Sequence, residues 1–276
     1  MKTYPVVLTI AGSDSGGGAG IQADIKTMSA LGVFATSVIT AVTVQNTMGV
    51  SGIYDVPCNI VADQIEAVLS DFPVKAIKIG MINQPDLVEI IANAIKKYQI
   101  KNVVLDPVMV ATSGSKLMQN ATVEKIKKEL FPLSTVVTPN LHEASVLLGY
   151  EINNEKEMAS AAEKLASFGG KSVLIKGGHL SGKKVTDILY LSDEKITKAF
   201  SSPKIRTKNL HGTGCTLSSA IAVVLALGES IIESVELAKI YITFAIEMGK
   251  NISIGNGNGA VNHFAAPKKL RIINLK

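Results

Sequence analysis

Short runs of apolar, β-branched residues alternate along the chain with longer segments whose apolar positions recur at helical spacing. The short runs predict six strands, at residues 6–11, 37–44, 76–80, 103–106, 136–138 and 173–176. The first of these is apolar at almost every position, which is typical of a strand that is covered on both faces. The pattern therefore predicts an α/β protein whose mostly parallel sheet lies between helical layers.

The segments with helical spacing predict helices at residues 19–31, 59–70, 85–98, 121–130, 141–148, 156–168, 212–227 and 230–250. Residues 188–191 and 195–200 flank a short polar turn and predict a β-hairpin. The sequence contains no internal repeat, no low-complexity segment and no linker rich in proline or serine. We therefore expect residues 1–276 to form a single domain.

Composition narrows the class of partner. Hydrophobic residues make up 47% of the 276 positions and charged residues 18%, which excludes a disordered chain or a charged coiled coil. The net charge of +5 is mild, and with no tryptophan and 5% aromatic residues the chain lacks the basic, aromatic surface of nucleic-acid-binding proteins. No apolar run is long enough to span a membrane. We therefore expect a cytoplasmic protein with a small, anionic ligand.

Several familiar motifs are absent. Residues 177–184 resemble a phosphate-binding P-loop, but Lys184 replaces the hydroxyl residue that holds magnesium there. No dinucleotide-binding glycine fingerprint follows a strand, and no nucleophile elbow is present. Cys58 and Cys215 are far apart in a chain without a paired-cysteine motif, which argues against a zinc site or a disulfide framework.

The segment from His211 to Cys215 is the strongest local signal. Gly212 and Gly214 allow a tight turn directly before an apolar helix, and the free N–H groups at a helix start attract anions. Cys215 would lie in the first turn, where the helix dipole lowers a thiol pKa. The alternative is that Cys215 is simply a small core residue.

Three other positions carry candidate chemistry. Lys176 ends an apolar strand in front of two glycines, and a lysine in such a place requires an anion. Asn140 and Glu143 have the spacing of a capping box, so spacing alone favours a structural role for both. Asp24, at the edge of an apolar helix stripe, either contacts a ligand or is solvated. The four histidines lack metal-ligand spacing.

Taken together, these residues resemble one family over nearly the whole chain. The matching segments are TIAGSD at 9–14, GGAGIQAD at 17–24, QNT at 45–47, KIGM at 78–81, VLDPVM at 104–109, TPNLHE at 138–143, KGGH at 176–179 and TKNLHGTGC at 207–215. They are similar to the bacterial hydroxymethylpyrimidine/phosphomethylpyrimidine kinases, which belong to the ribokinase-like superfamily.

The resemblance implies a three-layer α/β/α sandwich of the ribokinase type. It also implies that ATP and Mg²⁺ are used to phosphorylate 4-amino-5-hydroxymethyl-2-methylpyrimidine and then its monophosphate, in thiamine biosynthesis. A homodimer is the assembly that the family implies. The closest alternative is a pyridoxal or pyridoxine kinase of the same superfamily, and a nucleotide-binding regulator without turnover is a further one.

The resemblance also assigns roles to individual residues. The anion hole is Gly212, Thr213 and Gly214, and Cys215 stands in the place of the catalytic base. Lys176 neutralises the transferring phosphate, Asn140 serves the nucleotide phosphates, and Glu143 and Asp106 serve the metal. The substrate-binding residues that it implies are Gln45, Asp24, Gly12, Met81, Val44 and Val108.

Two positions depart from the family pattern, and one supports the choice of substrate. Gly16 stands where the family often has serine, and Ala260 stands where proline is usual. The amide of Gln45 both donates and accepts hydrogen bonds, which matches an amino group beside a ring nitrogen. This match favours the aminopyrimidine over pyridoxal.

Overall fold

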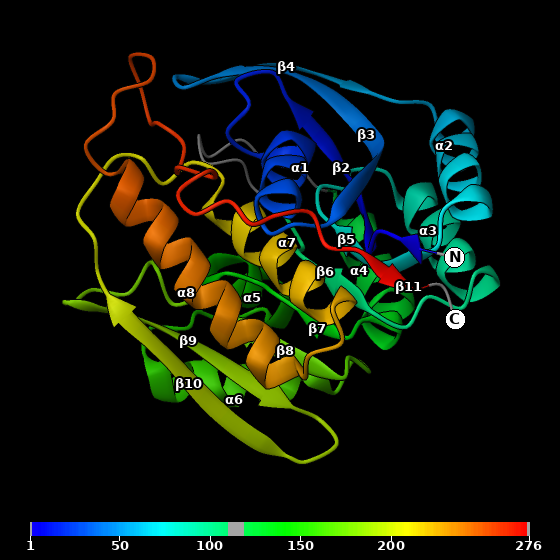
Figure 1. Ribbon diagram of the computed structural model, residues 1–276. Coiled ribbons are helices and arrows are strands. Elements are labelled where there is room, and N and C mark those ends of the chain that lie inside the picture. The colour runs from blue at the N-terminus through cyan, green and yellow to red at the C-terminus, as the bar shows by residue number, and fades with distance from the viewer. Residues whose placement is uncertain (1, 110–118, 275–276) are drawn as a thin grey trace.

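The computed structural model describes residues 2–109 and 119–274. Within these residues, a nine-stranded sheet has the order β10-β9-β8-β7-β6-β5-β2-β3-β4 (Figure 1). Its strands are β2 (Val6–Asp14), β3 (Phe34–Asn46), β4 (Gly49–Asp55), β5 (Val74–Ile79), β6 (Val103–Leu105), β7 (Val136–Val137), β8 (Ser172–Ile175), β9 (Lys184–Leu191) and β10 (Ile196–Pro203). Neighbours from β3 to β8 pair in parallel, whereas β4, β9 and β10 pair antiparallel.

Helices cover both faces of the sheet (Figure 1). One face packs against α1 (Gly20–Ala30), α7 (Thr213–Ala226) and α8 (Ile231–Gly249). The other packs against α2 (Cys58–Asp71), α3 (Pro85–Lys97), α4 (Asn120–Glu129), α5 (Leu141–Leu148) and α6 (Glu155–Ala166), with a short 3-10 helix, η1 (Phe131–Leu133), after α4. The predicted three-layer α/β/α sandwich is thereby confirmed.

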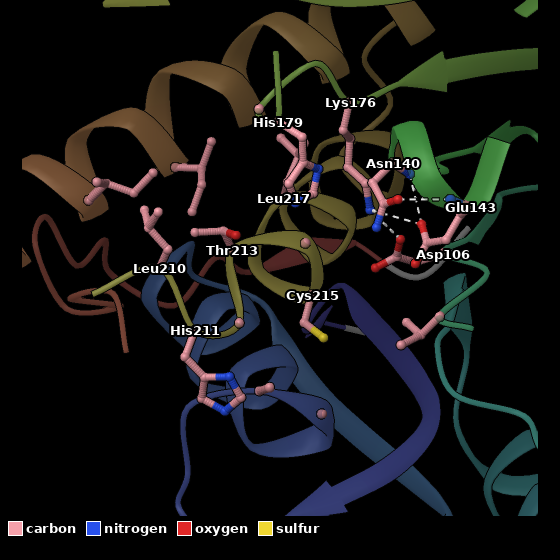
Figure 2. Close-up of a pocket in the computed structure, with 18 of the residues that line it drawn as sticks. Asp106, Asn140, Glu143, Lys176, His179, Leu210, His211, Thr213, Cys215 and Leu217 are labelled. Carbon is pink, nitrogen blue, oxygen red and sulfur yellow. Dashed lines mark hydrogen bonds and ion pairs between the residues drawn. The ribbon is translucent and has the colours of Figure 1, made fainter. Parts of the chain in front are cut away.

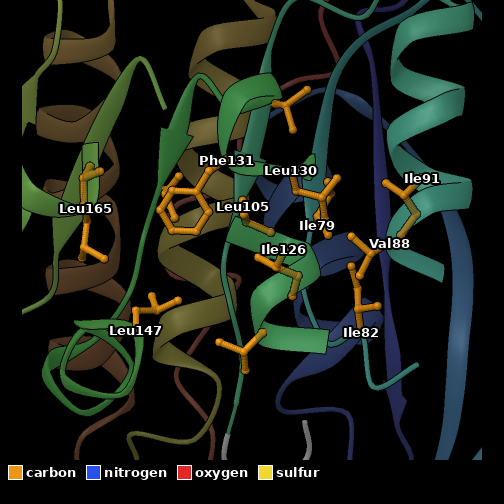
Figure 3. Close-up of a cluster of buried hydrophobic side chains, with 14 of the residues drawn as sticks. Ile79, Ile82, Val88, Ile91, Leu105, Ile126, Leu130, Phe131, Leu147 and Leu165 are labelled. Carbon is orange, nitrogen blue, oxygen red and sulfur yellow. The ribbon is translucent and has the colours of Figure 1, made fainter. Parts of the chain in front are cut away.

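The layers are joined by two apolar clusters, one on each face. The larger cluster contains Ile79 and Leu105 from the strands and Ile91 and Ile126 from the helices, all essentially without solvent exposure (Figure 3). A core of this extent supplies the main driving force for folding, because the apolar area that it removes from water is large. It also holds the parallel strands in a fixed relation, so the loops that follow them have defined positions.

The sequence pattern missed some strands and shortened others. β3 runs on to Asn46 and turns into β4, which had no predicted counterpart. The β4 sequence contains two glycines, and its apolar side chains Ile53 and Tyr54 are exposed, so no alternating pattern marks it as a strand. The predicted hairpin is present, but both of its strands are longer than predicted.

The candidate site residues lie at one end of the parallel strands. The carboxyl ends of β2, β5, β6, β7 and β8 lie side by side, and the loops that follow these strands carry the candidate residues. At the opposite edge, β1 (Lys2–Thr3) pairs with β11 (Ile273–Asn274), which brings the two ends of the described chain together. Over the described residues, no helix has both the length and the apolar character that crossing a membrane requires.

Candidate active site

A cavity of about 620 Å³ opens at the carboxyl edge of the sheet. Its walls come from the loops after β2, β5, β6, β7 and β8, from the start of α7 and from one side of α8. Figure 2 shows Cys215 between His211 on one side and Lys176, Asp106 and Glu143 on the other. The cavity therefore has two chemically different ends with a sulfur atom between them.

The start of α7 has a backbone that only glycine fits. Gly212 has a φ of 79°, and a Cβ there would lie 1.8 Å from the carbonyl oxygen of Gly18. No side chain caps the helix, and Gly212, Thr213, Gly214 and Cys215 all line the cavity. An uncapped helix start that faces a cavity is an anion site, because its N–H groups and the helix dipole both favour negative charge.

The second glycine of this turn lets a lysine approach the helix. A Cβ on Gly214 would lie 3.3 Å from Lys176 Nζ and 3.6 Å from Asp106 Oδ2. Lys176 Nζ is itself 2.7 Å from Asp106 Oδ1 and 4.0 Å from Glu143 Oε2. The cavity therefore combines an ammonium group, a helix start and two carboxylates within a few ångströms.

The charges in this cluster are perturbed in opposite directions. Burial opposes ionisation of Asp106, but the Lys176 and Lys78 ammonium groups hold its pKa below the usual range. Burial raises the pKa of Glu143 to about 7, because the attraction of Lys176 does not offset the loss of hydration and Asp106 repels a second negative charge. Glu143 thus gains a proton more easily than an exposed glutamate does.

Asn140 and Glu143 form the capping box that their spacing predicts. Asn140 Oδ1 accepts the N–H of Glu143 at 2.9 Å, and Glu143 Oε2 accepts the N–H of Asn140 at 2.7 Å. Both residues also line the cavity, so the structural and the functional interpretation hold for the same side chains. The cap fixes the Glu143 carboxylate where a ligand entering the cavity meets it.

The donor set suits a magnesium ion that is shared with phosphate. Within the described residues, no group of three or more His, Cys, Asp or Glu side chains forms a cage for a metal. Mg²⁺ is usually held by one or two carboxylates together with substrate phosphates and water, rather than by an all-protein cage. The buried carboxylates of Asp106 and Glu143, beside an anion site, fit that arrangement.

Cys215 differs from the sequence expectation. Burial raises the pKa of its thiol to about 11, and the carboxylates of Asp24 and Asp106 act in the same direction, although the Lys78 ammonium opposes them. Burial and the neighbouring carboxylates thus oppose the lowering of the thiol pKa that the sequence predicts from the helix start. The sequence could not show this, since the neighbouring carboxylates come from distant segments.

The predicted substrate residues divide into two groups. Gln45, Gly12, Met81 and Val108 line the cavity. Two others do not: Val44 is 63% exposed on β3, next to Gly52 of β4, and Asp24 is completely buried. Direct substrate contact by Asp24 or Val44 stays a prediction, although neither residue is among those that line the cavity.

Asp24 instead belongs to a buried network behind the cavity wall. Its carboxylate accepts hydrogen bonds from Thr9 Oγ1 at 2.6 Å, Lys78 Nζ at 2.9 Å and Ser219 Oγ at 2.7 Å. Burial alone would lower the pKa of Lys78, but the Asp24 carboxylate holds it above the usual value. Sequence analysis gave Lys78 no role, although a lysine inside an apolar strand is a signal of such a pair.

Two further polar pairs were missed. Lys239 Nζ lies 2.7 Å from Asp187 Oδ2, and Asp187 Oδ1 accepts the N–H of Gly177, the residue after Lys176. At the other end, His211 Nε2 lies 2.8 Å from Asp14 Oδ2. In both pairs the partners are far apart in sequence, so only the fold reveals them.

The two departures from the family pattern lie beside the His211–Asp14 pair. Gly16 donates its N–H to Asp14 Oδ1 at 2.8 Å, and a Cβ there would lie 3.1 Å from that oxygen. Ala260 forms an isolated bridge with His211. Neither departure lies at the Lys176 end of the cavity.

Comparisons with known proteins agree with this geometry. The family model described as phosphomethylpyrimidine kinase matches residues 14–262. The chain is 50% identical over 260 residues to a hydroxymethylpyrimidine/phosphomethylpyrimidine kinase of Rhizobium meliloti, covering 94% of this chain and 97% of that protein. It is 49% identical to the thiamine biosynthesis bifunctional protein of Geobacter sulfurreducens over 96% of this chain, but it spans only about half, 53%, of that longer protein.

Solved structures give the same picture. The crystal structure of a phosphomethylpyrimidine kinase from Clostridium difficile matches with a TM-score of 0.77 and 47% identity, covering 87% of this chain and 99% of that one. An ADP complex of Bacillus subtilis pyridoxal kinase matches with a TM-score of 0.88 and 35% identity, covering 95% and 98%. The fold is thus common to both kinases, while the sequence is more similar to the first. The family model and the relatives together show that this chain belongs to the phosphomethylpyrimidine kinase family.

Proposed function

We propose that this protein transfers the γ-phosphoryl group of ATP to the hydroxymethyl group of 4-amino-5-hydroxymethyl-2-methylpyrimidine, and then phosphorylates the resulting monophosphate, in thiamine biosynthesis. The observation that carries the proposal is the two-ended cavity. Gln45, whose amide can hydrogen-bond to a pyrimidine ring, lines one end of this cavity. The start of α7 and Lys176 line the other end, where they would stabilise a phosphoryl group.

Phosphoryl transfer requires positioning and charge neutralisation more than covalent help from the protein. The N–H groups at the start of α7 and the ammonium of Lys176 are fixed around one point, held by Gly212, Gly214 and Asp106. Groups already oriented toward the charge that develops in the transition state need no rearrangement during the reaction. This end of the cavity therefore serves the transferring phosphoryl group.

Magnesium is part of the proposal. Asp106 and Glu143 would hold Mg²⁺ together with phosphate oxygens, and Asn140 would contact the nucleotide phosphates. When bound, the ion neutralises phosphate charge. A cation would also favour the ionised form of Glu143, whose pKa is raised to about 7 by burial.

The proton balance assigns Cys215 its role. The hydroxymethyl oxygen forms a bond to the γ-phosphorus, the bond from that phosphorus to the bridging oxygen of the leaving ADP breaks, and the hydroxyl proton passes to the Cys215 sulfur. Because the pKa of the thiol is raised to about 11, the sulfur must first lose its own proton to solvent water before it accepts the hydroxyl proton. The Lys78 ammonium in the cavity wall favours that ionisation.

Pyridoxal kinase activity is the second candidate, favoured by the TM-score of 0.88 to a pyridoxal kinase complex. Pyridoxal also offers a hydroxymethyl group on a flat heteroaromatic ring, so a shared fold does not separate the two substrates. The Gln45 amide favours the aminopyrimidine, because it matches an adjacent donor and acceptor.

A homodimer and a cytoplasmic location complete the proposal. The outer face of α8 carries a row of exposed apolar side chains at helical spacing, which is unusual for a face in contact with water. The row consists of Leu237, Ile240, Phe244 and Met248. We assign this row to the dimer contact, so Ile240→Glu should convert a dimer to a monomer in light scattering. The cytoplasmic location is proposed from the bacterial relatives of the family.

A substrate panel tests the proposed function. The purified protein is incubated with ATP and Mg²⁺ and with the pyrimidine alcohol, its monophosphate or pyridoxal, and ADP release is measured. We expect turnover of the first two substrates with higher kcat/KM than pyridoxal. Lys176→Met, purified in the same way, controls for contaminating kinases. Preference for pyridoxal, or no turnover of either pyrimidine, would contradict the proposal.

A further inference from the structure

The end of the cavity that Gln45 lines also contains His211, to which the proposed function gives no role. His211 precedes the anion hole, and its Nε2 lies 2.8 Å from Asp14 Oδ2 and 3.2 Å from the amide group of Gln45. Asp14, Gln45 and His211 all line the cavity, and the side chains of Asp14 and His211 are 2% and 12% exposed. Three segments distant in sequence therefore meet at one point.

The protonation of Asp14 defines what His211 does there. Burial opposes ionisation of Asp14, but hydrogen bonds from His211 and from backbone N–H groups hold its pKa below the usual value. Its Oδ1 accepts the N–H of Gly16, and its Oδ2 accepts those of Gly18 and Ala19. An ionised carboxylate only accepts, so the proton between Oδ2 and Nε2 belongs to the histidine. His211 Nε2 is thus a donor.

A donor at Nε2 determines how the Gln45 amide must be turned. The nitrogen and oxygen of an amide exchange places by a half-turn, and the hydrogen-bond network decides between them. In the structure, the Gln45 amide oxygen lies 3.2 Å from Thr43 Oγ1 and the amide nitrogen lies 3.2 Å from His211 Nε2. Thr43 Oγ1, however, donates its one proton to the carbonyl oxygen of Ser13 at 2.7 Å, so a half-turn of the amide is required that brings the donating nitrogen to Thr43 Oγ1. The amide oxygen then faces His211 Nε2, whose N–H donates a bifurcated hydrogen bond to Asp14 Oδ2 and to this oxygen. Both neighbours therefore require the same orientation.

We propose that His211, held as a donor by Asp14, fixes the orientation of the Gln45 amide and so selects the substrate ring. The fixed amide keeps one N–H and one oxygen lone pair for a ligand, in a defined order along the cavity wall. An aminopyrimidine edge, with an amino donor beside a ring-nitrogen acceptor, matches that order. A ring with the donor and the acceptor in the reverse order would place its donor against the N–H of the Gln45 amide. Leaving two donors unpaired in this way costs binding free energy in a buried site.

This inference rests on the proposed pyrimidine substrate, and it makes His211 a positioning residue rather than a catalytic one. Because His211 would act only through Gln45, its effect must vanish when the amide is absent. A purely structural role next to Gly212 would instead disturb the anion hole and lower kcat. The two possibilities are therefore separated by a double-mutant cycle on substrate affinity.

The experiment measures calorimetric Kd values of the pyrimidine alcohol and of ADP for the wild type, His211→Leu, Gln45→Ala and the double variant. We expect His211→Leu to raise the Kd of the alcohol about tenfold, the worth of one buried hydrogen bond. In the Gln45→Ala background, the same change should alter it less than about twofold. The Kd of ADP should stay unchanged, and His211→Gln, which keeps an N–H donor, should restore much of the affinity.

Three outcomes would overturn the inference. The first is that His211→Leu raises the Kd of the alcohol by the same factor with and without Gln45. The second is that His211→Leu leaves this Kd unchanged and lowers only kcat. The third is a wild-type protein that neither binds nor phosphorylates the alcohol, which overturns the proposed function as well. A wild type that turns over the alcohol together with an additive cycle overturns only the role of His211. Thermal unfolding of each variant controls for loss of the fold.

Discussion

Two lysines, one near the end of β5 and one directly after β8, show how the same residue type serves different purposes. Lys78 is completely buried and pairs with Asp24, whose carboxylate also accepts from Thr9 and Ser219. Lys176 is 14% exposed and pairs with Asp106, while a second carboxylate, Glu143, stands 4.0 Å away. The Lys78–Asp24 pair belongs to a closed network without an exposed side chain, although Lys78 forms part of the cavity wall, whereas the second pair leaves its ammonium partly exposed in the cavity.

The difference shows that a buried charge indicates function only when its surroundings leave it room for a further partner. Burial opposes the charge of both lysines, and nearby carboxylates hold the pKa of both above the usual value. Their pKa shifts therefore do not distinguish the two lysines. Their geometry does, because Lys176 adjoins Gly214 at the uncapped start of α7.

The largest expected effect concerns Cys215, which lies within electrostatic reach of both lysines. Cys215→Ala should lower kcat by about 10²–10⁴-fold, the usual contribution of a general base, and leave the KM for ATP unchanged. Because the thiol pKa is raised to about 11, the kcat of the wild type should rise between pH 7 and pH 10, where the thiolate fraction grows. Stopped assays across this range provide the measurement.

Cys215→Asp sharpens the test of the base. A carboxylate accepts the proton at neutral pH, so this variant should exceed Cys215→Ala in activity and lose the rise of kcat with pH. Alkylation of Cys215 by iodoacetamide should be slow at neutral pH, the reverse of the sequence expectation. Full turnover by Cys215→Ala would assign the proton to water or to the phosphate instead.

Lys78→Met tests the closed network. It leaves the Asp24 carboxylate buried without a cation, and breaking a buried pair in this way costs about 3–5 kcal/mol of unfolding free energy. Urea denaturation followed by circular dichroism measures the loss. In the double variant with Asp24→Asn, no unpaired charge remains, so part of the stability should return. Unchanged stability in Lys78→Met would contradict the closed-network interpretation.

Lys176→Met tests the Lys176–Asp106 pair, whose ammonium faces the cavity. The ammonium is needed chiefly while charge develops on the transferring phosphoryl group, so kcat should fall by about 10²–10³-fold with little change in the KM for the pyrimidine. Steady-state kinetics with each substrate varied in turn separate these quantities. A kcat within a factor of about two of the wild type would make Lys176 a structural cation, like Lys78.

The smallest effect concerns the pH dependence of stability through Glu143. Because its pKa is raised to about 7, the folded protein keeps a proton that the unfolded chain releases at lower pH. This stabilisation is fully present below the unfolded pKa near 4.5 and is lost as the pH rises through 7. Glu143→Gln retains a capping side chain but cannot titrate. Between pH 5 and pH 8, the wild type should therefore lose about 2–3 kcal/mol of unfolding free energy that this variant keeps.

Denaturant titrations at both pH values provide the comparison. Addition of ADP and Mg²⁺ should weaken the pH dependence of the wild type, because a bound cation favours the ionised carboxylate. Equal pH dependence in both proteins would contradict a raised pKa of Glu143 in the folded protein.

The sheet was predictable because its central strands are apolar on both faces, and their loops carry glycines and polar residues in recognisable order. β4 escaped prediction because its apolar side chains are exposed, so burial leaves no pattern in the sequence. The expectation of a single domain stays a prediction.

The sequence pointed to Gly212, Cys215 and Lys176 because their signals are local, and all three line the cavity, while their roles stay predictions. The site was not predictable where partners come from distant strands. Asp24 looked like a helix residue near a ligand loop, but Lys78 binds it from another strand. The raised thiol pKa of Cys215 has the same origin, since no sequence window contains both the sulfur and the carboxylates that surround it.

The pairing of β1 with β11 has a consequence for how such a chain joins other proteins. Lys2–Thr3 and Ile273–Asn274 form one small ribbon at the amino-terminal edge of β2, whereas the cavity lies at the carboxyl edge (Figure 1). A second enzyme fused at either end would therefore attach at the same place, on the side away from the substrate entrance. This arrangement lets a gene fusion form without obstructing catalysis, and the Geobacter relative, of which this chain matches about half, is a bifunctional protein.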